Sequence, residues 1–284
     1  MKTITDTIRS CAVKRQRPDN SDYLALSHSD ESKLTAKFSI SRKEIQILAL
    51  ENGITPQRYC RNQNYLSLDD QVHLLTSHVA VIGLGGLGGA VAEILCRLGI
   101  GTLTLVDGDV FDESNLNRQL LSSVKNLGVP KADAAATRVQ QVNPAVITHP
   151  VMDFLSAQNG ADILQNAQIA VDCLDTIDGR FTLEDACKAL SIPFISGAIG
   201  GTAGQVTTIT PDSIGLEMIY GSRGDSPKRG VEAHLGTLVY SAVSIAALQC
   251  SEIVALATGK TPQLINKLLL ADYTFPSMEI VQFG

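Results

Sequence analysis

Apolar and polar positions follow one another along this chain in blocks that predict alternating strands and helices. Residues 78–82 form a β-branched apolar run that ends at a glycine, which is typical of a buried parallel strand. Residues 87–98 place apolar side chains at helical spacing, and Gly99 follows as a C-cap. Residues 102–106 form a second apolar strand. This order predicts a parallel α/β sheet.

The same alternation continues to the end of the chain. A helix opens at Lys131, and the later pattern predicts a strand, a helix, two strands, a long apolar helix and two final strands. Their expected positions are 169–172, 177–190, 193–197, 203–210, 237–258, 268–273 and 279–282. We therefore expect helices on both faces of the sheet and a C-terminal mixed β extension.

A glycine-rich loop joins the first strand to the first helix, and its glycines are Gly83, Gly85, Gly86 and Gly88. Gly83 permits the tight turn, Gly85 lets the backbone approach a phosphate, and Gly88 lets the helix pack close to the strand. The helix N-terminus adds unpaired N–H groups and a positive dipole end. Asp107 follows the second strand, where a carboxylate accepts hydrogen bonds from ribose hydroxyls. The pattern predicts a Rossmann-like nucleotide site.

A cluster of possible phosphate ligands follows Asp107. Asn115, Asn117, Arg118 and Gln119 lie in a polar loop, and Lys131 opens the next helix. A pyrophosphate between two riboses needs only the glycine loop, whereas a triphosphate has more charge to neutralise. Arginine provides a planar fork for phosphate oxygens, and lysine a point charge. Each residue alone is better explained as a solvated side chain, but the set at this spacing favours a phosphate site.

Asp175 follows the strand predicted at 169–172. Ligands of open α/β sheets gather at the carboxyl ends of the strands. A carboxylate in that place can hold Mg²⁺ together with substrate phosphates. The alternative is that Asp175 caps the helix that begins near residue 177.

The order of these segments, from about residue 57 to the C-terminus, resembles the ThiF/MoeB/HesA family, bacterial relatives of ubiquitin-activating enzymes. The matching segments are 58–62, 83–88, Asp107, 115–119, 128–131 and 172–175. The resemblance implies an ATP·Mg²⁺-dependent nucleotidyltransferase with a Rossmann-like ATP-binding sheet. Its substrate would be the C-terminal glycine of a ubiquitin-fold sulfur carrier protein with a diglycine tail. Such carriers, of the molybdopterin or thiamin type, are activated for thiocarboxylate formation.

The resemblance also implies roles for individual residues. Asp107 would hold the ribose; Asn115, Arg118 and Lys131 would hold phosphates; and Asp175 would bind Mg²⁺. Arg61 matches an arginine that reaches the triphosphate of the other subunit, which implies a homodimer. Without the resemblance, Arg61 is only an exposed basic residue near a helix.

Two further regions are interpreted with the help of the resemblance. The small residues of 196–201 are expected to line a channel for the carrier tail, with a tight turn as the alternative. Residues 1–56 are expected to be an N-terminal extension with a short helix, and 57–284 the adenylation domain. Within the extension, 1–40 is predicted to be a loose polar segment, disordered or used for carrier docking. Capping boxes at Ser41 and Ser67 predict short helices to about Glu51 and Leu75.

The cysteines depart from the family pattern. The six cysteines include no CxxC pair, so we expect no structural zinc. Segment 221–236 corresponds to the crossover loop in which relatives often place a reactive cysteine. It has none, and Gly230 falls near that position. Adenylation is therefore expected without a covalent sulfur intermediate at this loop.

Charge and composition narrow the remaining possibilities. A net charge of −6 gives no indication of nucleic-acid binding. The N-terminus lacks the apolar core of a signal peptide, and no apolar run is expected to reach the ~20 residues of a membrane helix. Scattered cysteines fit a reducing cytoplasm. We expect a cytoplasmic protein without membrane insertion.

Other functions remain open at this point. An NAD-dependent oxidoreductase would explain the glycine loop and Asp107 but would give Arg61, Arg118, Lys131 and Asp175 no role. A non-catalytic scaffold that binds a nucleotide or a carrier would also fit the missing crossover cysteine. A third possibility keeps the chemistry but activates a peptide precursor of a natural product.

Overall fold

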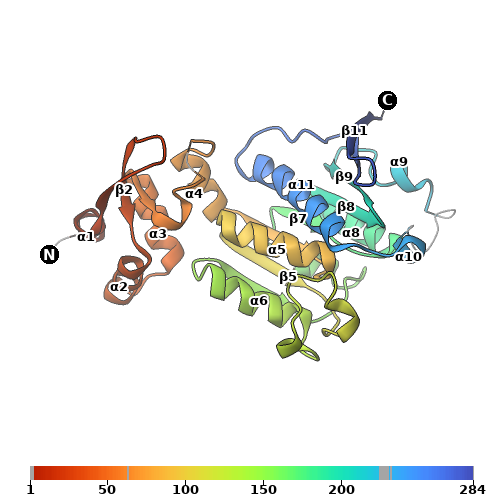
Figure 1. The fold of residues 1–284 in the computed structure, drawn as a ribbon, viewed down its shortest axis with the longest axis horizontal. Coiled ribbons are helices and arrows are strands. Elements are labelled where there is room, and N and C mark those ends of the chain that lie inside the picture. Colours follow the sequence, from red (N-terminus) through yellow and green to blue (C-terminus); the bar gives the residue numbers. More distant parts are fainter. Residues whose placement is uncertain (1–2, 63, 224–229, 231, 284) are drawn as a thin grey trace.

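An eight-stranded sheet forms the centre of the part of the chain that the structure describes. The structure is a computed structural model, and it describes residues 3–62, 64–223, 230 and 232–283 (Figure 1). The strand order is β11-β10-β9-β8-β7-β4-β5-β6. The strands are β4 (His78–Ile82), β5 (Thr102–Val106), β6 (Ile147–Val151), β7 (Ile169–Asp172), β8 (Phe194–Gly200), β9 (Ala203–Ile209), β10 (Lys267–Asp272) and β11 (Ser277–Gln282).

The sheet has a parallel half and an antiparallel half. Strands β6, β5, β4, β7 and β8 pair in parallel, whereas β9, β10 and β11 are added by antiparallel pairing. Strand β4 pairs with both β5 and β7, so the chain order reverses direction there. Such a switch point opens a crevice at the carboxyl ends of the strands. The Rossmann-like prediction with a mixed C-terminal extension is confirmed.

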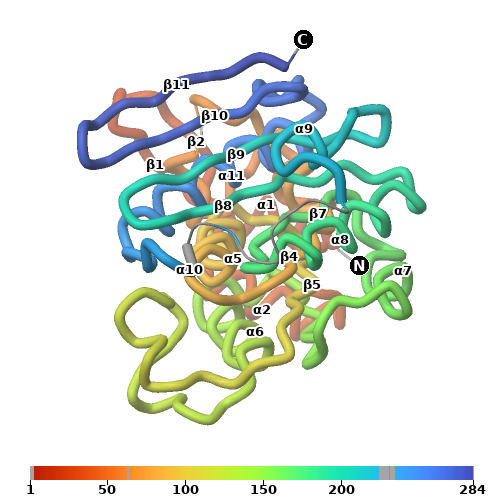
Figure 2. The backbone as a smooth tube through the Cα atoms, turned by 90° about the vertical axis from the view of Figure 1, so that its right-hand side faces the viewer, coloured from red at the N-terminus to blue at the C-terminus, as the bar shows by residue number. Residues whose placement is uncertain are grey.

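Helices cover both faces of this sheet (Figures 1 and 2). The side chains of β4 alternate between the two faces, with Val79 and Val81 in one core and Ala80 and Ile82 in the other. The first core contains residues of α5 (Gly86–Leu98), α6 (Lys131–Val142) and α11 (Val239–Ala257). The second contains residues of α7 (Gly160–Leu164) and α8 (Ile177–Leu190). Strand β6 and helix α7 were not predicted.

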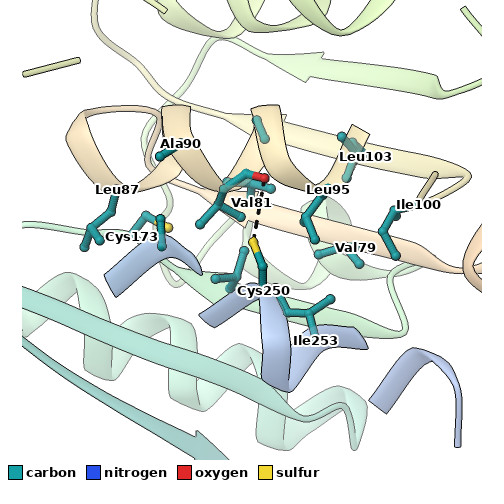
Figure 3. Packing of buried hydrophobic residues seen from close by; sticks show 14 of the residues in the cluster. Val79, Val81, Leu87, Ala90, Leu95, Ile100, Leu103, Cys173, Cys250 and Ile253 are labelled. Carbon is teal, nitrogen blue, oxygen red and sulfur yellow. Dashed lines mark hydrogen bonds between the residues drawn. The ribbon is translucent and has the colours of Figure 1, made fainter. Parts of the chain in front are cut away.

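Helix α11 differs from expectation, because by length and composition alone it could cross a membrane. Its side chains Ile245, Cys250 and Ile253 are instead buried against α5 and the sheet. Figure 3 shows Cys250 beside Leu95 and Val79, with the Cys250 thiol donating to the Val91 carbonyl. Packing of one face into the core therefore accounts for the apolar character of α11.

Residues 3–56 fold into a small unit, so the prediction of a loose segment over 1–40 is wrong for the residues described. This unit contains α1 (Ile4–Cys11), β1 (Val13–Gln16), β2 (Asp22–Leu26), α2 (His28–Phe38), α3 (Arg42–Glu51) and β3 (Ile54–Pro56). The three strands form a separate sheet, and Ile8, Leu26, Leu34, Ile45 and Ile54 form its core. The capping boxes predicted at Ser41 and Ser67 are confirmed, and Ser67 opens α4 (Leu68–Thr76).

A buried polar network joins this N-terminal unit to the main sheet. Tyr59, in the short helix η1 (Gln57–Tyr59), is fully buried, and its hydroxyl donates to the Gln46 side chain of α3 at 3.2 Å. Asn143, just after α6, donates to the Tyr59 hydroxyl at 2.9 Å and to the Cys96 carbonyl at 2.8 Å. Because buried polar groups are costly to leave unpaired, this network fixes the N-terminal unit on the domain.

Candidate nucleotide site

The glycine loop connects β4 to α5 and lies at the switch point of the sheet. Gly83 has φ +90°, and a Cβ atom there would lie 2.7 Å from the Cys173 carbonyl oxygen. A Cβ atom on Gly88 would lie 1.7 Å from the Gly83 carbonyl oxygen. Both positions therefore require glycine, one for the turn and one for the close approach of α5. Gly83, Gly85 and Gly86 line a cavity of about 340 Å³, and Gly88 is not among its lining residues.

This cavity collects most of the predicted site residues. Besides the loop glycines, its walls include Asp107, Arg118, Gln119, Lys131 and Asp175. Residues after β6 also contribute, among them Asp153 and the exposed ring of Phe154. These had not been predicted because β6 itself was missed. The arrangement brings backbone amides, carboxylates and three cationic side chains, those of Arg118, Lys131 and Arg180, together at the carboxyl edge of the parallel strands.

Asp107 is held by two backbone amides directly after β5. Its carboxylate accepts from the Leu84 N–H at 2.7 Å and from the Asp109 N–H at 2.9 Å. Burial raises the pKa of Asp107, against the opposing effect of these hydrogen bonds. Lys131 is buried at the start of α6, with its ammonium 2.9 Å from the Asp109 carboxylate and 4.0 Å from that of Asp107. Asp109 was missed by sequence reasoning, although it lies two residues after Asp107.

Arg118 and Gln119 present polar groups to the same cavity. The Arg118 guanidinium donates to the Ser114 carbonyl at 2.9 Å and to the Asn117 side chain at 3.0 Å. Gln119 is buried, and its side-chain oxygen has no hydrogen-bond partner among the residues described. A buried polar atom without a partner is expensive unless a ligand satisfies it. Gln119 therefore fits a cavity that binds a polar ligand.

The structure places Asn115 and Asn117 outside the cavity walls. The Asn115 side chain accepts from the Asp112 N–H at 3.1 Å in the capping box of η2 (Glu113–Asn115). The Asn117 side chain accepts a hydrogen bond from Arg118. Both asparagines therefore shape the loop that carries Arg118.

Asp175 is exposed on the cavity wall, three residues beyond the end of β7. The cap of α8 is Thr176, whose hydroxyl accepts from the Gly179 N–H at 3.3 Å. The carboxylate of Asp175 is therefore not used as the helix cap. No group of three or more histidine, cysteine or acidic side chains suited to a metal occurs among the described residues. A single carboxylate still suits Mg²⁺, which keeps several waters and binds substrate phosphates.

Arg180, on α8, is a buried residue of this site that was not predicted. Its guanidinium donates to the Asp172 carboxylate at 2.6 Å and to the Gly197 carbonyl at 2.7 Å, and it also donates to the Leu174 carbonyl. These contacts tie the end of β7 and the middle of β8 to the loop before Asp175. The contacts of Arg180 with Asp172 and Gly197 join a helix to two strands that come together only in the folded chain. No local spacing of residues in the sequence therefore predicts them.

Cys173 and Arg61 take no part in the hydrogen bonds described above. Cys173 lines the cavity, but burial raises the pKa of its thiol well above the usual value, so it remains a protonated packing residue. Arg61 lies on an exposed turn after η1 and is absent from the cavity walls of its own chain. Of the predicted crossover segment 221–236, residues 224–229 and 231 lie outside the described residues.

Comparisons with known proteins agree with this fold. The model of the ThiF family matches residues 59–283. The SAMP-activating enzyme E1 of Haloferax volcanii is 31% identical over 231 residues, which cover 80% of this chain and 84% of that protein. The molybdopterin-synthase adenylyltransferase of Escherichia coli is 32% identical over 209 residues, covering 72% and 82%. The solved structure of E. coli MccB with ATP shares the fold, with a TM-score of 0.67, 20% identity and coverage of 90% and 79%.

Proposed function

The chain belongs to the ThiF family, and we propose that it uses ATP to adenylate the C-terminal carboxylate of a ubiquitin-fold sulfur carrier protein. The observation that carries this proposal is the meeting of the glycine loop, Arg118, Lys131 and Asp175 in one cavity. Relatives that match over most of their length are named as adenylyltransferases or activating enzymes. An NAD-dependent oxidoreductase would leave Arg118, Lys131 and Asp175 without a role.

The proposed reaction is an in-line transfer of AMP. A carboxylate oxygen of the carrier attacks the α-phosphorus of ATP, the bond to the bridging oxygen breaks, and pyrophosphate leaves. Lys131 and Arg118 neutralise charge on the phosphates, and Asp107 accepts hydrogen bonds from the ribose. Because phosphoryl chemistry of this kind depends mainly on positioning and electrostatic stabilisation, fixed cations are the main contribution of the protein.

The proposal includes Mg²⁺ at Asp175. A bound Mg²⁺ would supply charge neutralisation at the phosphates, and the exposed carboxylate of Asp175 is available to hold it. Arg180 positions this carboxylate by fixing the preceding Leu174 carbonyl.

We also propose a homodimer in which Arg61 serves the partner's site. The exposed position of Arg61, away from the cavity of its own chain, supports this arrangement. Mixing inactive Arg61→Ala and Lys131→Ala subunits should restore part of the activity, because one of the two sites in a mixed dimer keeps both residues. A mixture that stays inactive, although the subunits exchange, would contradict the sharing of Arg61 between subunits.

The direct test is ATP–pyrophosphate exchange by the purified protein, with and without diglycine-tailed carriers from the same genome. Exchange that depends on one carrier would establish adenylation and identify that carrier as a molybdopterin-type, thiamin-type or other sulfur carrier. Tight ATP binding without exchange would favour a scaffold or another acceptor, and selective NAD binding would reject the proposal. We place the reaction in the cytoplasm, because the described cysteines are free thiols.

A further inference from the structure

A second cavity adjoins the nucleotide cavity on the antiparallel side of the sheet. Its volume is about 530 Å³, and it shares Arg180 and Ile199 with the nucleotide cavity. Its other walls come from β8, β9, β10, α8, α9 (Glu217–Tyr220) and α10 (Glu232–Leu235). The shared wall means that a molecule leaving the nucleotide cavity past Ile199 enters this second cavity directly.

The walls of the second cavity are mainly apolar. Leu235 and Leu270 remain 62% and 39% exposed, although they face a cavity that also contains Ile177, Ile219 and the Tyr220 ring. The polar side chains on these walls are those of His234, which is exposed, and of Arg180, Gln205 and Tyr220, which have partners inside the protein. Arg180 bonds to Asp172, and the Gln205 amide donates to the Tyr220 hydroxyl at 3.2 Å. The cavity therefore suits an apolar group better than a charged one.

A short segment at the C-terminal end of α10, residues 235–237, contributes to the walls of both cavities. Its anchor is the β8–β9 turn, where the Gly201 N–H donates to the Gly236 carbonyl at 2.8 Å. Leu235 contributes to the second cavity, and Thr237 contributes to the nucleotide cavity. Figure 2 shows α10 close to β8. An extended polypeptide beneath residues 235–237 would therefore pass from the second cavity to the nucleotide.

We propose that the second cavity binds an apolar side chain of the substrate tail, a few residues before the carboxylate that is adenylated. This inference rests on the proposed function for the direction of the tail. Successive residues of an extended chain advance by about 3.3–3.6 Å and point to opposite sides. One side chain can therefore turn into the cavity while the terminal glycines reach the nucleotide. A tail made only of glycine would leave the apolar walls exposed to water.

The test uses labelled octapeptides that end in Gly-Gly and carry alanine elsewhere. A single leucine is placed in turn at the third to the sixth position from the carboxyl end. Binding to the full-length protein is measured by fluorescence anisotropy in the presence of a non-hydrolysable ATP analogue. At one position, leucine should tighten binding roughly tenfold to a hundredfold over the all-alanine peptide, as expected for a buried leucine side chain.

Two variants locate the effect. Ala203→Leu adds bulk to a residue of the cavity wall. It should lower the affinity for the leucine peptide to that for the all-alanine peptide. Leu270→Ala should remove part of the same preference. Leu24→Ala is the matched control, because Leu24 is a strand residue with 44% exposure against 39% for Leu270, but lies in the N-terminal unit. Thermal unfolding and ATP binding verify that each variant is folded.

The outcomes separate this inference from the proposed function. Equal affinity for all peptides, or equal losses in Leu270→Ala and Leu24→Ala, would overturn the side-chain site. Leucine-dependent binding without any pyrophosphate exchange would keep the site but reject adenylation. Carrier-dependent exchange without a leucine preference would keep adenylation and reject the site.

Discussion

The two cavities that meet at Arg180 are built by opposite halves of one sheet. The nucleotide cavity lies at the carboxyl ends of parallel strands. The glycine loop directly follows β4 and Asp107 directly follows β5, so the strand pairing places both at this edge. The second cavity lies on antiparallel strands and is lined mainly by aliphatic side chains. The nucleotide cavity thus favours a charged ligand, because backbone dipoles and cationic side chains point into it. The second cavity favours an apolar ligand, because its walls are mainly aliphatic.

The largest expected effect concerns the cations of the nucleotide cavity. Arg118→Ala should lower the rate of carrier adenylation by roughly 10²–10³-fold, the usual consequence of losing one donor to a charged transition state. The half-buried position of Arg118 on a loop predicts little change in folding. Initial rates of pyrophosphate exchange measure the effect. Arg97→Ala is the control, because that arginine pairs with Glu93 on the surface of α5.

The next effect concerns Asp175. Asp175→Asn should raise the Mg²⁺ concentration needed for half-maximal exchange by roughly tenfold to a hundredfold, since changes around a metal ion commonly alter its affinity by this factor. The helix cap at Thr176 remains intact, so thermal stability should not change. An unchanged Mg²⁺ titration would remove Asp175 from the metal site.

A smaller effect is expected from the titration of Asp107. Burial raises the pKa of this carboxyl, so Asp107 takes up a proton at a higher pH than an ordinary aspartate. Protonation removes the charged acceptor for the ribose, and ATP affinity should fall about tenfold as the pH decreases through this pKa. Calorimetric titrations between about pH 7 and about pH 4 follow the change. Asp107→Asn should bind more weakly at neutral pH, with a flatter profile.

The smallest effect belongs to the antiparallel half. Arg223 makes two 2.6 Å hydrogen bonds to Asp185 and lies 4.8 Å from the Phe181 ring centre, which fixes the chain directly after α9. Arg223→Gln should raise the KM for the carrier roughly twofold to fivefold, as expected for a partly exposed ion pair. ATP affinity should stay constant.

Arg138→Gln provides the comparison for this variant. Arg138 makes a similar double contact with Glu93, and its side chain is 44% exposed against 41% for Arg223. It lies on α6, far along the chain from α9. An equal rise in KM in both variants would show that the Arg223 anchor has no special relation to the second cavity.

Most of the parallel half could be predicted from sequence, because its signals are local. The glycine spacing, the apolar run of β4 and the acid after β5 each lie within a few residues of the feature that they indicate. The N-terminal unit was missed for a physical reason. All four residues of β1 are exposed, so the strand has no alternating pattern, and its partner β2 buries only two residues. Such strands are recognisable only through their pairing.

The remaining differences in the site arise from contacts between distant segments. Asn115 has a residue type suited to a phosphate, yet its side chain is used to cap a turn. Arg180 looks like an ordinary helix residue, but the fold places it against Asp172 and Gly197. The second cavity likewise forms only where β8, β10 and α10 meet, and no single segment of the sequence predicts that meeting.

Arg180 and Ile199 form a wall that is common to the two cavities, and this common wall has a thermodynamic consequence. Ligands in contact with the same side chains are linked, and linkage is reciprocal. Whatever factor bound ATP applies to the affinity for the tail, the tail must apply the same factor to the affinity for ATP. Measuring nucleotide binding with and without a peptide therefore reports how strongly the two halves of the sheet communicate.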